Sequence, residues 1–287
     1  MTNHSLSRSL LFLSVSIAML SGCEKDVTNI KLPESKPKLV VGCFISPQDT
    51  LITVTLTRSN PIWGTDHNNS NNLSVADASV TISNGTNSVT VPYNSMDEQY
   101  ELQASLFPIV SGQTYYLNIS TPKGESVSAS CTVPISNLTS LTIDFIDTAA
   151  ASANKKIKVK WQDIPNQTNY YRVFAQIGII DNAIGDTLYN DMYSDNSLQN
   201  DNNKDGQEMS SIMEGGYYSY INGVQQSVTV IAYTIYLLTI DAEYYKYQYS
   251  LEHYTYGDPF SEPSSLYTNI KGGLGVFAAY QKIMVNG

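Results

Sequence analysis

The feature that most constrains the fold of this chain is a series of short runs in which apolar and polar residues alternate. Leu39 to Ile45 and Leu51 to Leu56 are two such runs. Because successive side chains of a strand point to opposite faces, this alternation predicts strands with one buried face. Two further runs flank Asn84-Gly85, a pair that tolerates the positive φ of a tight hairpin. Short strands at this spacing predict a β-sandwich.

A second set of β-type runs follows Pro134 to Asn137, which we take as the domain boundary. Ile157 to Trp161 and Tyr170 to Phe174 repeat the strand pattern and are similar to the first strands of a fibronectin-type sandwich. Val228 to Ile240 predicts a long buried strand. The apolar spacing from Ala242 to Tyr254 fits an amphipathic helix.

The length of 287 residues and the hydrophobic content of 42% allow a sizeable core and favour two domains. We therefore expect a mostly β chain with two tandem β-sandwich (immunoglobulin/fibronectin-like) domains and a short helix and long polar loop in the second. The expected segments are a signal peptide at 1–22, a lipidated cysteine with its tether at 23–37, and sandwiches at 38–134 and 138–287.

The first 23 residues have the parts of a bacterial lipoprotein signal. Arg8 is the positive region, Leu10 to Leu20 is a short apolar region, and Ser21-Gly22 precede Cys23. Small residues before a cysteine resemble the lipobox, in which the cysteine becomes the acylated first residue. We expect Cys23 to carry the several acyl chains, palmitate among them, that stable anchoring requires. The alternative is an ordinary secretory signal with a chance cysteine.

The residues after Cys23 bear on where the protein is anchored. A polar, proline-containing stretch up to Pro37 reads as a tether. Lys25-Asp26 resembles the acidic surface-export signal of Bacteroidota lipoproteins. We expect anchoring in the outer membrane at the cell surface, with the periplasmic face as the alternative.

The formal charge of −10, with only 16 Lys and Arg, argues against nucleic acid as a partner.

Cys43 and Cys131 remain once Cys23 is acylated, and they lie on the first and last predicted strands of the first domain. An even pair in an oxidising compartment is compatible with one disulfide. Two buried thiols are the equally weighted alternative.

Catalytic motifs are missing from the sequence. It has no Gly-x-Ser-x-Gly elbow, no His-Glu-x-x-His and no Walker loop. Gly273-Leu274-Gly275-Val276-Phe277-Ala278 matches a weak dinucleotide pattern, but that fingerprint needs a following helix and strand. We interpret these glycines as close backbone packing near a last strand, name no catalytic residue and expect no enzyme activity.

Tyrosine is abundant, with 21 residues, and clusters in the second domain. Tyrosine combines an apolar face with a hydroxyl, so such clusters can form binding surfaces. The candidate surface is Tyr217, Tyr218, Tyr220, Tyr245 and Tyr249. The alternative, which we favour, is that several of them fill a core.

The segment from Asp201 to Gly206 resembles the first half of a calcium loop. Asp201, Asn203 and Asp205 stand at alternate positions before a glycine, which aims their oxygens at one cation. Position twelve is Ile212, so a closing carboxylate would have to come from elsewhere, for example Glu208, Glu214 or Asp195. We expect weak calcium binding at most, and a solvated turn is the alternative. No other cofactor is expected.

The C-terminal residues Asp258 to Pro263 and Tyr267 to Phe277 resemble the closing motif of the Bacteroidota lipoproteins of the domain of unknown function 4249 family. Leu39 to Gly42, Gly112 to Leu117 and Asp205 to Gln207 are also similar to that family.

Such families often accompany TonB-dependent outer-membrane uptake systems. The resemblance therefore implies a non-catalytic, surface-associated binding or accessory module, with a TonB-dependent receptor and associated lipoproteins as partners. A structural, adhesin-like β protein is the second hypothesis, and an envelope hydrolase is the third.

Overall fold

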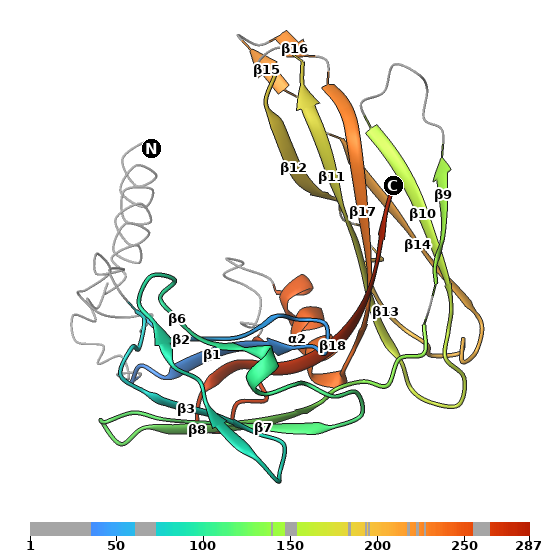
Figure 1. The fold of residues 1–287 in the computed structure, drawn as a ribbon. Coiled ribbons are helices and arrows are strands. Elements are labelled where there is room, and N and C mark those ends of the chain that lie inside the picture. The colour runs from blue at the N-terminus through green and yellow to red at the C-terminus, as the bar shows by residue number, and fades with distance from the viewer. Residues whose placement is uncertain are drawn as a thin grey trace, which may run out of the picture. The chain divides into compact units, whose positions relative to one another are not determined.

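The computed structural model describes residues 36–60, 73–138, 140–146, 154–182, 185–192, 194, 196–216, 219–221, 224–226, 228–254 and 265–287. Strands dominate these residues (Figure 1). The first half contains β1 Leu39–Ile45, β2 Leu51–Arg58, β3 Ser79–Ser83, β4 Ser88–Thr90, β5 Tyr93–Asn94, β6 Gln99–Gln103, the 3-10 helix η1 Ala104–Leu106, β7 Thr114–Ser120 and β8 Ser126–Thr132. The second half contains β9 Thr142–Ile146, β10 Asn154–Gln162, β11 Tyr170–Asp181, β12 Thr187–Met192, β13 Leu198–Asn200, β14 Glu208–Gly216, β15 Ser219–Ile221, β16 Val224–Gln226, β17 Val228–Ile240, helix α2 Ala242–Glu252 and β18 Leu274–Asn286.

One long sheet joins strands from both halves of the chain. Its order is β12-β11-β17-β18-β1-β2-β6-β5, with β13 also paired to β11. The last strand, β18, runs antiparallel to β17 and parallel to β1 (Figure 1). A 3-stranded sheet β14-β10-β9, a 4-stranded sheet β4-β3-β7-β8 and the small pair β15-β16 complete the pairing among the described strands.

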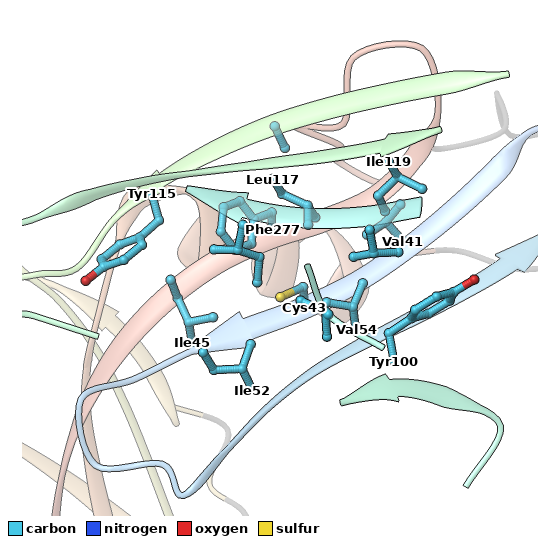
Figure 2. Close-up of a cluster of buried hydrophobic side chains, with 14 of the residues drawn as sticks. Val41, Cys43, Ile45, Ile52, Val54, Tyr100, Tyr115, Leu117, Ile119 and Phe277 are labelled. Atoms are coloured by element: carbon cyan, nitrogen blue, oxygen red, sulfur yellow. The ribbon is translucent and has the colours of Figure 1, made fainter. Parts of the chain in front are cut away.

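The first core lies between the long sheet and the 4-stranded sheet. Strand β1 alternates buried and half-buried residues along its length, as the sequence predicts. Cys43, Ile45 and Ile52 from the long sheet share a buried cluster with Tyr115 and other residues of the 4-stranded sheet (Figure 2). Phe277 of β18, with no exposed surface, belongs to the same cluster. The C-terminal strand therefore completes the core of the N-terminal half.

A second core lies between the long sheet and the 3-stranded sheet. Val173 and Leu237, on β11 and β17, are buried in one cluster with Val159 and Trp161 of β10. Trp161 packs edge to face on Tyr171, with 5.5 Å between the ring centroids. Trp161 therefore belongs to the core.

The opposite face of the long sheet carries helix α2. Tyr244 of the helix shares a third cluster with Leu238, Ile240 and Val276 of the sheet, and Phe44 packs against it. Asp241 caps the helix by accepting a hydrogen bond from the Tyr244 N–H at 2.8 Å. The strands on either side of α2 in the chain, β17 and β18, both belong to the sheet that it covers.

Several sequence predictions are confirmed. The fold is mostly β with a short helix, β17 spans the predicted Val228 to Ile240, and α2 occupies most of the predicted helix. The glycines near the start of the last strand do pack against backbone: a Cβ on Gly275 would lie 1.9 Å from the Val41 carbonyl oxygen. No described helix has the length and apolar character to cross a membrane.

Candidate functional site

The best candidate site is a groove on the helix-bearing face of the long sheet. It lies beside α2, has a volume of about 360 Å³, and is lined by residues from β1, β11, β17, β18 and α2. We call it the α2 groove. Its lining consists of Phe44, Arg172, Phe174, Gln176, Tyr236, Leu238, Tyr244, Tyr280 and Lys282.

The floor of the α2 groove is built from side chains in register across three strands. Leu238 of β17 lies opposite Arg172 of β11 and opposite Lys282 of β18. Tyr236, two residues earlier on β17, lies opposite Phe174. Their rings stack with 4.7 Å between centroids and an interplanar angle of 16°. Strand alternation sends these residues to one face because their odd-numbered neighbours fill the second core.

Arg172 is the principal polar group of the groove. Its Nη1 donates a hydrogen bond of 2.8 Å to the Tyr244 hydroxyl. Its Cζ lies 5.9 Å from the ring centroid of Phe174 and 5.9 Å from that of Tyr244. Among the described residues, no carboxylate forms an ion pair with this guanidinium. A planar guanidinium held between aromatic rings retains donors suited to a carboxylate.

Lys282 on the other side of the floor is already paired. Its ammonium lies 3.1 Å from Asp49 Oδ1, and the Tyr280 hydroxyl donates to the same carboxylate at 2.9 Å. Burial, followed by the charge of Asp49, raises the pKa of Tyr280 above its ordinary value. Tyr280 is therefore a neutral hydrogen-bond donor, and Asp49 is committed to contacts within the chain.

Helix α2 supplies one wall of the groove through Tyr244. This ring packs edge to face on Phe44, with 5.0 Å between centroids. The Asp241 carboxyl that caps the helix below Tyr244 is 9% exposed, and its Oδ2 has no hydrogen-bond partner. Burial raises the pKa of Asp241 to about 7. Tyr244, which forms the groove wall, is thus positioned by a carboxyl group whose pKa is unusually high.

Two other hollows, of about 550 and 620 Å³, lie on the outer face of the 4-stranded sheet. Small polar side chains such as Ser128 and Asn118 line both. Part of their wall is structural, because Lys271 exchanges two backbone hydrogen bonds with Ser128. These hollows are larger than the α2 groove, but their lining is more polar than apolar, whereas apolar surface predominates in the α2 groove, so we rank them below it as ligand sites.

The predicted tyrosine surface is only partly described. Tyr217 and Tyr218 lie outside the described residues, and Tyr220 is described only as part of strand β15. Tyr245 and Tyr249 are on α2, where their rings stack with 6.1 Å between centroids. Neither lines the α2 groove.

The contacts of the two helix tyrosines differ. The Tyr245 hydroxyl accepts a hydrogen bond from Asn200, and its ring lies 4.6 Å from that of Tyr170. Tyr249 is 49% exposed and stacks on His253. Tyr245 therefore fixes the helix to the sheet, and Tyr249 alone of the two presents a largely exposed ring.

The structure brings Asp201 and Asp205 together with a carboxylate that the sequence did not indicate, that of Asp163. One oxygen from each of the three lies within 4.8 Å of the others. Neither Glu208 nor Glu214 belongs to this group, and Asp195 lies outside the described residues. The predicted closing ligands are thus replaced by a residue from the loop after β10, because that loop folds against the Asp201 turn.

The carboxylates of this acidic cluster accept hydrogen bonds from neighbouring residues. Asp163 accepts from the Tyr171 hydroxyl at 2.7 Å and from the Gly206 N–H at 2.7 Å. Asp201 accepts from the Asn169 N–H at 3.0 Å. Asn203, the remaining predicted ligand, takes the left-handed conformation with φ of 63°. These hydrogen bonds fix the two loops to each other.

Residues 25–284 match the model of the domain of unknown function DUF4249. The chain belongs to the DUF4249 family. The match includes every residue of the α2 groove and the acidic cluster, so both features lie within the family domain. No curated protein matches the sequence.

Cys43 and Cys131, the predicted disulfide pair of this DUF4249 protein, are unlinked in the structure and buried in the first core. Cys43 and Cys131 are 1% and 3% exposed and come from β1 and β8. In the unlinked state, burial raises the pKa of both thiols, which makes them poor nucleophiles once the core has formed. The predicted disulfide stays a prediction. Cys23, the predicted lipidation site, lies outside the described residues.

Arg172 and its neighbours were not among the candidates drawn from the sequence. The signal was present in the alternation of Tyr170 to Gln176, where Arg172 and Phe174 share one strand face. No local pattern indicates that β17 and β18 place Leu238, Tyr236 and Lys282 beside Arg172 and Phe174.

Proposed function

We propose that this DUF4249 protein is a non-catalytic binding module and that the α2 groove holds its ligand. The observation that carries the proposal is Arg172, a guanidinium without a carboxylate partner among the described residues, set in an aromatic groove. Ligand sites typically combine an apolar lining with a few convergent polar groups. The α2 groove has this composition.

Binding accounts for the groove better than catalysis does. The carboxylate of Asp49, which contacts two residues of the groove lining, is engaged by Lys282 and Tyr280. The remaining groups are hydrogen-bond donors and aromatic faces, a set that suits recognition and orientation of a ligand. This composition supports a module that holds a ligand unchanged.

We further propose that the module works at the outer membrane, anchored by acyl chains on Cys23 and serving a TonB-dependent uptake system. The lipobox and the tether support the anchor, and the family resemblance supports the role in uptake. We retain two sandwich-like halves, 38–134 and 138–287, as the proposed domain arrangement, with β18 shared between them.

Co-purification tests the uptake role. The full-length, lipidated protein is tagged at its C-terminus, solubilised from envelopes in mild detergent and captured. We expect a TonB-dependent receptor among the captured proteins at a constant ratio. Capture of the protein without any such receptor would contradict the uptake role.

Fractionation tests the anchor separately. The Cys23→Ala variant should move from the membrane to the soluble fraction, because the predicted anchor is removed. A Ser21→Ala variant keeps a small residue before the cysteine and serves as the control that stays with the membrane. Retention of Cys23→Ala in the membrane would refute the lipobox assignment.

Calcium at Asp201, Asn203 and Asp205 remains a prediction, and Asp163 now joins the residues to test. Thermal melts with calcium and with chelator measure it. A bound ion raises the midpoint by mass action, and Asp205→Asn removes that rise. Equal midpoints in both conditions would leave the cluster as a loop held by hydrogen bonds.

A further inference from the structure

We propose that the α2 groove selects a small ligand with one carboxylate beside a flat apolar group, and that Arg172 binds the carboxylate. This inference rests on the proposed function, because it names the chemistry of the ligand that the groove would hold. Three observations carry it: the contacts of Arg172, the net charge of the groove, and the register of its floor.

The contacts of Arg172 leave it suited to an anion. Its hydrogen bond to a described side chain goes to the Tyr244 hydroxyl, which is neutral. The rings of Phe174 and Tyr244 hold the guanidinium at equal distances of 5.9 Å. A guanidinium fixed in this way keeps a planar pair of donors that matches the two oxygens of a carboxylate.

The net charge of the groove favours a single negative charge. Arg172 and Lys282 contribute two positive charges, and Asp49, in contact with Lys282, contributes one negative charge. One positive charge is left, on a chain whose formal charge is −10. A polyanion would therefore meet too little positive charge in the groove and repulsion from the rest of the molecule. A ligand with a single carboxylate would bring the net charge of the groove to zero.

The register of the floor places an apolar surface beside the guanidinium. Leu238 is the direct cross-strand neighbour of Arg172, about 5 Å away by strand spacing. Tyr236, stacked on Phe174, follows on the same face. A carboxylate bound at Arg172 thus brings the adjoining part of its ligand over Leu238 and the Tyr236 ring. The volume of about 360 Å³ suits a ligand of one or two amino-acid units.

The test compares two probes that differ only in the carboxylate, N-acetyl-L-phenylalanine and N-acetyl-L-phenylalaninamide. Affinities are measured by NMR titration against the full mature chain. We expect the carboxylate probe to bind about tenfold more tightly, because it makes charge-assisted hydrogen bonds that the amide cannot make. Arg172→Gln should abolish this preference, so that the two probes bind alike. Arg172→Lys, which keeps the charge without the fork, should retain part of it.

Lys123→Gln is the matched control, because Lys123 is an exposed cation in the turn before β8 and far from the groove lining in sequence. It should leave the preference unchanged. Equal binding of the two probes to the wild-type protein, no binding of either at millimolar concentration, or an unchanged preference in Arg172→Gln would each overturn the inference. Phe174→Leu separates this from the proposed function: if it weakens both probes while Arg172→Gln has no effect, the groove still binds ligands but not through a carboxylate.

Discussion

Stability should depend on pH through Asp241, the buried residue that caps α2. An aspartate in the unfolded chain ionises near pH 3.9. In the folded protein, burial raises the pKa of Asp241 to about 7, and the neighbouring charge of Glu243 adds to this. The folded state therefore binds a proton that the unfolded chain has lost. The stability from this group is complete below pH 4 and falls as the pH rises towards 7.

The size of the effect follows from the pKa difference. Between pH 5 and pH 8 the unfolded residue is ionised throughout, whereas the folded residue ionises near pH 7. At 1.36 kcal/mol per pH unit over about two units, the free energy of unfolding should fall by about 2–3 kcal/mol. Asp241→Asn keeps an oxygen that can cap the helix but cannot ionise. It should remove this part of the pH dependence.

Urea unfolding at pH 5 and pH 8 measures the effect in the wild-type protein and in the variant. Asp77→Asn, which removes an exposed carboxylate, is the control and should keep the wild-type slope. Equal pH dependence in the wild-type protein and in Asp241→Asn would refute the assignment. Asp241 also positions Tyr244, which lines the α2 groove. Ligand binding in the groove can therefore be measured in the same wild-type and variant proteins.

Three further predictions concern the fold. Gly275→Ala should lower the free energy of unfolding in urea by at least about 3 kcal/mol, because its Cβ would lie 1.9 Å from a backbone oxygen. The control Gly124→Ala has a similar φ but open space around its Cβ, and it should cost about 1 kcal/mol. Equal costs for the two variants would argue against the β1–β18 pairing. Asp163→Ala should lower the free energy of unfolding by about 3 kcal/mol, because it leaves three hydrogen-bond donors without their acceptor. A loss below about 0.5 kcal/mol would contradict that role. Cys43 and Cys131 should be linked in protein purified from envelopes, a bond that the chain-entropy model values at roughly 4–5 kcal/mol; two free thiols in non-reducing mass spectrometry would refute it.

Local patterns in the sequence predicted much of the local structure, but the long polar loop expected from Asp181 to Gly216 was wrong, because β12, β13 and β14 lie in that segment. The alternation in Leu39 to Ile45 gave β1, and the run from Val228 to Ile240 gave β17. The spacing after Asp241 gave the helix. Each of these depends on side chains within one segment, where period-2 and period-3.6 patterns decide which face is buried.

The long-range pairing could not be predicted in this way. The parallel pairing of β18 with β1 joins residues more than 230 positions apart, and no local pattern encodes it. The α2 groove depends on that pairing, because it brings Phe44 of β1 into the sheet beside β18. Asp163 was missed for the same reason, since a turn distant in sequence supplies the rest of its cluster.

The most direct test of the central claim, that the α2 groove is the ligand site, is to map where small molecules bind. A mixture of aromatic fragments, with and without a carboxylate, is titrated into the ¹⁵N-labelled mature chain and the amide shifts are assigned. The account predicts that the largest changes fall on β11, β17 and β18 around Phe174, Tyr236 and Leu238. Changes centred instead on Ser128 and Lys271, at the polar hollows of the 4-stranded sheet, would contradict it.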